Sequence, residues 1–254
     1  MISYEVLGNR KKEPLLMLCG LGMPMSAWGA TPKHFAEDFT IIMWDYPGLG
    51  KSSKLTHGYT TLDLAHDSAA LLDYLGIRQA HIIGYSMGGI VAQQLCVAYK
   101  GLAKGIAFLA STPVSDSVSW INPAAQTEMV KAANEEPANL IRVLIKYAFN
   151  KPVNRRIYGV LSRLYGATTD SDVLKKMFDA IAGQETWSDL PALRAEKAFA
   201  LNGTEDHLIN SDAGAALASR IPNCTADLIV GGSHSLLQEF RKTTEDKIRA
   251  FFLS

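Results

Sequence analysis

Residues 81–98, which read HIIGYSMGGIVAQQLCVA, decide the fold. Their first part, His81–Ile83, is a short apolar run of the kind that forms a strand buried on both faces. The pattern G-x-S-x-G follows over residues 84–88, and its glycines have a steric reason, because side chains two positions either side of Ser86 would collide with neighbouring backbone. Strand, sharp turn and helix in this order present a serine hydroxyl to a substrate, so we predict that Ser86 is a nucleophile. The helical spacing is carried by Ile90, Val91, Gln94, Leu95 and Ala98.

Other short apolar runs recur along the chain and lack the alternation of a half-exposed strand. They are Leu15–Cys19, Thr40–Trp44, Gly105–Ala110, Ala198–Leu201 and Asp227–Val230. Helical patterns lie between several of them, for example over residues 64–75, where Gly76 supplies a C-cap. Alternating strands and helices predict an α/β fold with a mostly parallel central sheet flanked by helices.

The alternation stops between about residues 114 and 189, where helical stripes follow one another with no strand between them. The three stripes are Leu140, Val143, Leu144 and Tyr147; Ile157, Val160, Leu161 and Leu164; and Leu174, Met177, Phe178 and Ile181. Each apolar stripe needs a surface that covers it. We therefore predict a core of residues 1–113 and 190–254, interrupted by an all-helical cap of residues 114–189 over the edge of the sheet.

The composition excludes several classes of function. Basic and acidic residues number 25 each, so nothing favours binding to nucleic acid or to an anionic membrane. The 3 cysteines are not spaced as CxxC and do not suggest a disulfide framework. We see neither a signal peptide nor an apolar stretch long enough to span a bilayer. We expect a cytoplasmic protein without membrane insertion, whose partner is a small-molecule substrate.

A nucleophilic serine needs a base, and the base needs a carboxylate that orients it. His234 lies in a glycine-containing loop directly after the last predicted strand, and Asp206 follows the strand before it. Ser86 also follows a strand, so all three side chains lie at the carboxyl edge of the sheet, where ligands bind in open α/β folds. Asp116 is the alternative acid and His207 the alternative base. The chain order serine, aspartate, histidine favours Asp206 and His234.

The oxyanion of an acyl-transfer intermediate needs two hydrogen-bond donors. The first that we expect is the backbone N–H of Met87, at the start of the helix, where the helix dipole also favours negative charge. The second is expected from the loop of residues 19–22, at the backbone N–H of Leu21. Removal of one such donor typically costs about 3–4 kcal/mol of transition-state stabilisation.

Over essentially its whole length, the chain resembles the α/β-hydrolase superfamily, in the branch of small capped esterases, lactonases and C–C bond hydrolases. Residues 45–52, DYPGLGKS, are similar to the D-x-P-G-x-G-x-S loop of that family, and residues 203–206, GTED, to its acid loop. The family usually has His-Gly where this chain has Cys19 and Gly20. That histidine generally supports the oxyanion loop, so the departure concerns the geometry of the loop. We expect Cys19 to be a small buried thiol rather than a nucleophile.

We expect no cofactor and no metal. Residues 50–52, GKS, resemble the end of a P-loop, but Asp45 stands where that pattern needs a glycine. Residues 48–50, GLG, would begin a dinucleotide fingerprint, but Ser53 stands at its third glycine. No HExxH pattern or group of cysteines and histidines suggests a metal site.

These observations predict a carboxylesterase-like serine hydrolase that cleaves an ester, thioester or lactone of a small, largely apolar substrate through an acyl-enzyme. The apolar stripes of the predicted cap favour a hydrophobic substrate. The alternatives on the same fold are a C–C bond hydrolase, a non-hydrolytic lyase or cyclase, and a ligand-binding receptor. Three complementary side chains favour chemistry over binding alone.

Overall fold

A seven-stranded sheet forms the centre of the computed structural model, which describes residues 1–150, 170–182 and 184–254. The strand order is β1-β3-β2-β4-β5-β6-β7, in which β1 is antiparallel to β3 and every other neighbouring pair is parallel. This arrangement confirms the predicted α/β fold with a mostly parallel sheet. The strands are β1 (Tyr4–Leu7), β2 (Glu13–Leu18), β3 (Phe39–Trp44), β4 (Ala80–Tyr85), β5 (Ala103–Leu109), β6 (Ala195–Gly203) and β7 (Cys224–Ile229).

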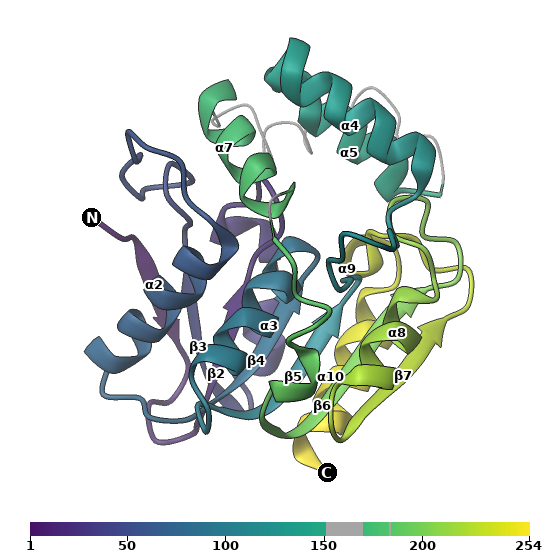
Figure 1. Ribbon diagram of the computed structural model, residues 1–254. Helices are drawn as coiled ribbons and strands as arrows, with labels where there is room; N and C mark the ends of the chain where they lie inside the picture. The colour runs from purple at the N-terminus through teal and green to yellow at the C-terminus, as the bar shows by residue number, and fades with distance from the viewer. Residues whose placement is uncertain (151–169, 183) are drawn as a thin grey trace.

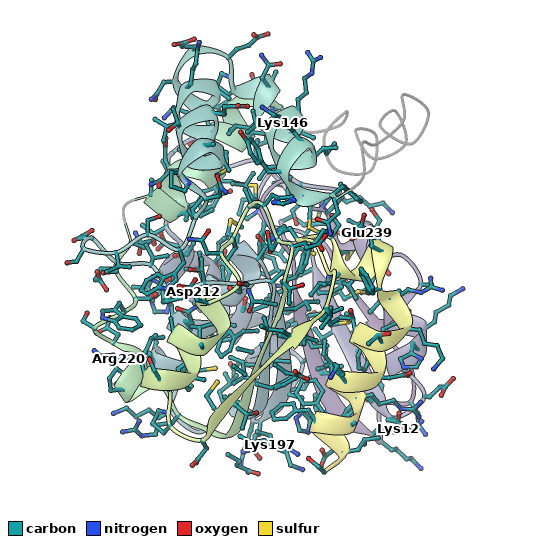
Figure 2. The ribbon with its side chains drawn as sticks, turned by 90° about the vertical axis from the view of Figure 1, so that its right-hand side faces the viewer. Lys12, Lys146, Lys197, Asp212, Arg220 and Glu239 are labelled. Atoms are coloured by element: carbon teal, nitrogen blue, oxygen red, sulfur yellow. The ribbon has the colours of Figure 1, made fainter. Side chains whose placement is uncertain are left out.

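Helices cover both faces of this sheet. Helices α2, α3 and α8 lie over the face toward the viewer in Figure 1, whereas α1 and α10 pack together on the other side. Figure 2 shows α8 and α10 on opposite sides of β7. These helices are α1 (Thr31–Phe35), α2 (Thr61–Tyr74), α3 (Met87–Ala98), α8 (Ala213–Arg220) and α10 (Arg241–Leu253), with the short α9 (Leu236–Glu239) before the last. Within the three described ranges, no helix has both the length and the hydrophobicity that a membrane span requires.

Among the described residues, three further helices lie beyond the carboxyl ends of the strands, at the top of Figure 1. They occur in the sequence between β5 and β6, and they are α4 (Pro123–Glu135), α5 (Leu140–Ala148) and α7 (Ser171–Ala182). The predicted stripe of Ile157, Val160, Leu161 and Leu164 lies outside the described residues. The division of the chain into a core and a cap of residues 114–189 stays a prediction.

Several of the described elements have no counterpart among the predicted ones, and β1 and α4 are two of them. Strand β1 is an edge strand whose residues are exposed or only partly buried, so it lacks the continuous apolar run that marks the inner strands. Helix α4 has little net hydrophobicity, but its start carries a local signal. The side chain of Asn122 accepts hydrogen bonds from the N–H groups of Ala124 and Ala125, and Pro123 is the first helical residue.

The buried face of α5 differs from the predicted stripe. Its buried residues are Leu140, Ile141, Ile145 and Ala148, whereas Val143, Leu144 and Tyr147 are only partly buried. The stripe was therefore wrong by about one residue in rotation around the helix axis. The partly buried residues Val143, Leu144 and Tyr147 still pack against the core, and Leu144 also lines the cavities at Ser86. Helical spacing alone does not distinguish these environments.

The last predicted strand is not buried on both faces, which corrects the interpretation of Asp227–Val230. β7 lies at the edge of the sheet, where three of its six residues are exposed, two are partly buried and Ile229 is buried. Leu228 is 41% exposed, and Val230, directly after the strand, is 84% exposed. An edge strand has one neighbour only, so an apolar run at that position is compatible with solvent exposure.

His81 is a buried histidine at the opposite end of β4 from the serine. Its Nε2 lies 2.9 Å from Oε2 of Glu13, and it packs against the rings of Phe39 and Phe252. Burial lowers the pKa of His81 below its usual value of 6.5, while Glu13 acts in the opposite direction and Lys104 and Lys197 add to the lowering. His81 is therefore a structural group whose neutral form the fold favours.

Candidate active site

Ser86 stands at a sharp turn between β4 and α3, with φ 54° and ψ −120°. Residues other than glycine rarely adopt positive φ. The turn is crowded, because a Cβ at Gly84 would lie 2.6 Å from the carbonyl oxygen of Gly88, and a Cβ at Gly88 would lie 2.3 Å from that of Leu18. The hydroxyl of Ser111 donates to the carbonyl oxygen of Ser86 at 2.9 Å. Surrounding contacts thus hold a strained backbone, as is usual where a side chain must be presented at a functional site.

His234 and Asp206 follow β7 and β6 and converge on Ser86. Nε2 of His234 lies 3.1 Å from the hydroxyl oxygen of Ser86, and Nδ1 lies 2.9 Å from Oδ2 of Asp206. The side chain of Asp206 is fully buried, and that of His234 is 6% exposed. Because an ionised carboxylate only accepts, the proton of the neutral imidazole belongs on Nδ1, and Nε2 is left to accept from the serine. The structure brings these three predicted residues together.

The carboxylate of Asp206 is held by its own loop. Its Oδ1 accepts hydrogen bonds from the N–H groups of Leu208 and Ile209, each at 2.8 Å. The N–H of Asn122, just before α4, donates to the carbonyl oxygen of Leu208 at 2.9 Å. Both carboxylate oxygens therefore have partners, and the orientation of Oδ2 toward the imidazole is fixed.

The alternative acid and base lie elsewhere. Asp116 is exposed, and its backbone N–H donates to Oε2 of Glu185 at 3.0 Å. His207 is also exposed. The hydrogen-bond partner of His234 is Asp206, so the geometry favours the pair that chain order favours.

Tyr85 is a buried residue of the site that the sequence did not single out. Its hydroxyl donates to the carbonyl oxygen of His234 at 2.9 Å, and the two rings lie 5.6 Å apart between centroids. The hydroxyl of Ser233 donates to Glu239 and accepts from the N–H of Ser235. These bonds hold the histidine loop from both sides. Only the position of Tyr85, directly before the nucleophile, hints at this contact in the sequence.

The end of α5 is joined to the same loop. The N–H of Ser235 donates to the carbonyl oxygen of Ala148 at 2.9 Å, and Nδ2 of Asn150 donates to the carbonyl oxygen of Gly231 at 2.8 Å. One helix from the segment between β5 and β6 is therefore fixed directly to the loop that carries His234.

The expected oxyanion donors lie on opposite sides of the serine in sequence. Met87 is the first residue of α3, where a backbone N–H has no partner within the helix. Leu21 lies in the loop after β2, and that loop is held by the buried carboxylate of Asp45, which accepts from the N–H of Met25 at 2.8 Å and from that of Lys51 at 3.1 Å. The DYPGLGKS segment therefore ties down the loop of Leu21. The role of the two N–H groups as oxyanion donors stays a prediction.

Other reactive groups near the site are few. Cys19 is 1% exposed, and burial raises the pKa of its thiol far above its usual range, so the thiol stays protonated at neutral pH. The expectation of a small buried thiol is confirmed. Among the residues that the structure describes, no group of three or more histidines, cysteines and carboxylates is placed to hold a metal ion.

Two cavities meet at Ser86. The larger has a volume of about 240 Å³ and the smaller about 60 Å³. His234 lines only the smaller cavity, and Met87 lines only the larger one. Apolar side chains dominate the lining of both. Four residues line both cavities: Leu21, Ser86, Leu144 and Leu208.

Comparison with known proteins gives both sequence and structural relatives. A curated relative from Cupriavidus necator, the dihydrolipoyllysine-residue acetyltransferase component of an acetoin cleaving system, is 33% identical over 42% of this chain and 29% of its own length. The chain covers less than half of the length of the first curated relatives that it matches. An esterase from Exiguobacterium antarcticum superposes with a TM-score of 0.88 at 15% identity, covering 100% of this chain and 96% of the esterase.

An enol-lactonase from Burkholderia xenovorans superposes with a TM-score of 0.86 at 21% identity, over 100% of this chain and 96% of the lactonase. At these identities, the structural likeness shows the fold alone. The family model described as alpha/beta hydrolase fold matches residues 13–240, which is most of the chain. The serine turn, the carboxyl-edge loops and this match agree, and the chain belongs to the alpha/beta hydrolase fold family.

Proposed function

We propose that the chain is a serine hydrolase that cleaves a carboxylic ester of a small, largely apolar molecule. The observation that carries this proposal is the continuous series of contacts from Asp206 through His234 to Ser86, at 2.9 Å and 3.1 Å. Both distances are within hydrogen-bond reach, which is the first requirement for a nucleophile, its general base and the group that orients the base.

In the proposed reaction, Nε2 of His234 takes the proton of Ser86 as the serine oxygen attacks the ester carbonyl carbon. Asp206 keeps the imidazole oriented and stabilises the imidazolium that forms. The N–H groups of Met87 and Leu21 donate to the oxyanion of the tetrahedral intermediate. The C–O bond to the alcohol then breaks, and the alkoxide oxygen receives the proton from Nε2. Water, deprotonated by the same imidazole, attacks the acyl-enzyme and releases the carboxylic acid.

The names of structural neighbours agree with this chemistry. One neighbour is an esterase and another is an enol-lactonase, and both names refer to cleavage of an acyl C–O bond. The apolar lining of the two cavities favours an uncharged, hydrophobic substrate. We propose accordingly that the partner of this chain is a small-molecule ester.

A fluorophosphonate probe tests the nucleophile directly, because it labels an activated serine irrespective of substrate preference. Wild-type protein is expected to take up one equivalent of probe, and Ser86→Ala is expected to take up none. Ser115→Ala is a matched control, since Ser115 lines the larger cavity but lies outside the proposed catalytic residues. Undiminished labelling of Ser86→Ala, or loss of labelling in Ser115→Ala, would contradict the assignment. Hydrolysis of simple alkyl esters, followed by titration of the released acid, then tests turnover.

A further inference from the structure

The two cavities at Ser86 differ about fourfold in volume, and the proposed chemistry assigns one arm of the substrate to each. We propose, as an inference that rests on the proposed function, that the substrate is an open-chain ester of a medium-sized apolar acid with a small alcohol. The acyl arm occupies the larger cavity, and the alcohol arm occupies the smaller one.

The position of His234 determines which arm lies where. The leaving oxygen of the alcohol must receive a proton from Nε2, so the alcohol arm has to lie on the side of the imidazole. His234 lines the smaller cavity and not the larger one. The acyl arm leaves the carbonyl carbon in the other direction, toward the cavity that Met87 lines.

The volumes set the size of each arm. An apolar cavity of about 150 Å³ holds a benzene molecule, which has about six non-hydrogen atoms. On that measure, a cavity of about 60 Å³ holds about two non-hydrogen atoms, as in a methyl or ethyl alcohol arm. The larger cavity of about 240 Å³ holds about ten, as in a hexanoyl or octanoyl arm.

The wall of the smaller cavity is fixed in place. Ile145 and Ala148 of α5 form part of it. The carbonyl oxygen of Ala148 accepts from the N–H of Ser235, and Asn150 donates to the histidine loop at Gly231. Since the wall and the base are hydrogen-bonded to each other, the smaller cavity is expected to discriminate strictly by size.

The larger cavity accepts an apolar chain along the flank of α7. Phe178 and Ile181 are the two residues of the predicted α7 stripe that are only partly buried, and both line this cavity. Their apolar surfaces lack a protein partner on that side, so an acyl chain would bury them.

The arrangement of the two cavities also favours open-chain esters over lactones as substrates. In a small lactone, the ring holds the acyl carbon and the alkoxy carbon on the same side of the ester bond. Such a ring cannot place one arm in the cavity that His234 lines and the other arm in the cavity that Met87 lines. An open-chain ester can do so, and we therefore expect it to be the better substrate.

Two ester series test the assignment, with acid release measured by titration at constant pH. In methyl esters, kcat/KM is expected to rise about fourfold per methylene from acetate to hexanoate. In hexanoate esters, kcat/KM is expected to fall at least about tenfold from the ethyl to the butyl alcohol. A small lactone is expected to react more slowly than methyl hexanoate. A preference for large alcohols with short acids, or for the lactone, would overturn the inference.

Substitutions in the two cavities test where the acyl arm and the alcohol arm of the substrate bind. Ile145→Ala enlarges the smaller cavity and is expected to raise kcat/KM for butyl hexanoate about tenfold relative to ethyl hexanoate, without a change in acyl preference. Ile181→Trp is expected to reduce the advantage of hexanoate over acetate at least about tenfold, without a change in alcohol preference. Val143→Ala is the matched control, because Val143 lies on α5 but lines a groove on the outer surface, and it should change neither preference.

Ile145→Val, which removes a single methyl group, supplies the same direction of change if Ile145→Ala does not fold. A shift in acyl preference from Ile145→Ala, or an equal effect from Val143→Ala, would refute the assignment of the arms. Failure of this inference differs from failure of the proposed function. Swapped preferences with normal labelling of Ser86 overturn only the placement, whereas absence of both labelling and ester turnover overturns the proposed function and the inference together.

Discussion

Gln93 offers a sharp test of how the segments on either side of the predicted cap are held. This fully buried side chain of α3 donates from Nε2 to the carbonyl oxygen of Thr112 at 2.9 Å, and its Oε1 accepts from the hydroxyl of Thr186 at 2.7 Å. The same hydroxyl accepts from the N–H of Val114 at 3.0 Å. One amide therefore joins the segment that leaves β5 to the segment that leads back toward β6.

Gln93→Met keeps the approximate volume and removes both hydrogen bonds. It leaves one carbonyl oxygen and one hydroxyl buried without these partners, each at a cost of about 1–3 kcal/mol. We expect the free energy of unfolding to fall by about 2–6 kcal/mol. We also expect KM for an ester to rise, because Thr112 and Val114 line the larger cavity.

Urea unfolding, followed by tryptophan fluorescence, measures the change as a lower midpoint with an unaltered slope. Gln94→Met is the matched control, since Gln94 is the neighbouring residue and its amide, which is only partly buried, donates to Oε1 of Gln184 at 3.1 Å. That variant should lose less than about 1 kcal/mol. Equal losses in the two variants would refute the argument that the buried amide holds the two segments.

Asp206→Asn should lower kcat for an ester by roughly 10³–10⁴-fold, because the imidazole loses its orientation and its tautomer. Asp116→Asn is the control and should leave kcat unchanged. The reverse result in steady-state kinetics would exchange the roles of the two acids. Tyr85→Phe should lower kcat severalfold at a similar KM, since a hydrogen bond of about 1 kcal/mol to the backbone of His234 is lost, and an unaltered kcat would show that this bond does not position the base. Burial lowers the pKa of His81 in the folded protein. Below about pH 6.5, the unfolded chain therefore binds more protons than the folded chain. The free energy of unfolding should accordingly fall as the pH drops below about 6.5. Urea titrations at several pH values measure this slope, which should be smaller in His81→Asn; an equal slope in the variant would assign the effect to other groups.

The strand–turn–helix at Ser86 could be predicted because its determinants are local. Glycine is required at positions 84 and 88 because a Cβ there would lie 2.6 Å and 2.3 Å from a backbone oxygen, and this requirement leaves a pattern in the sequence. Asp206 and His234 were predictable because each follows an inner or terminal parallel strand, and the carboxyl ends of such strands share one edge.

The features that the sequence did not predict depend on neighbours distant in the chain. The exposure of β7 depends on its place at the edge of the sheet rather than on its own apolar residues. The contact of Tyr85 with the backbone at position 234 joins residues 149 positions apart. The buried face of α5 depends on the elements that pack against it, among them α4. Periodicity describes one element at a time, so it does not carry this information.

The two hydrogen bonds between the end of α5 and the loop of His234 have a mechanical consequence. If α5 swings outward, it must either break the bond from Ser235 to Ala148 or draw the imidazole away from the serine. Outward movement of this helix thus either loses this bond or misaligns the imidazole, so the seated helix supports the alignment that the proposed chemistry needs. A substrate that seats the helix would in the same motion align the proton acceptor, so that occupancy and reactivity become linked without any additional switch.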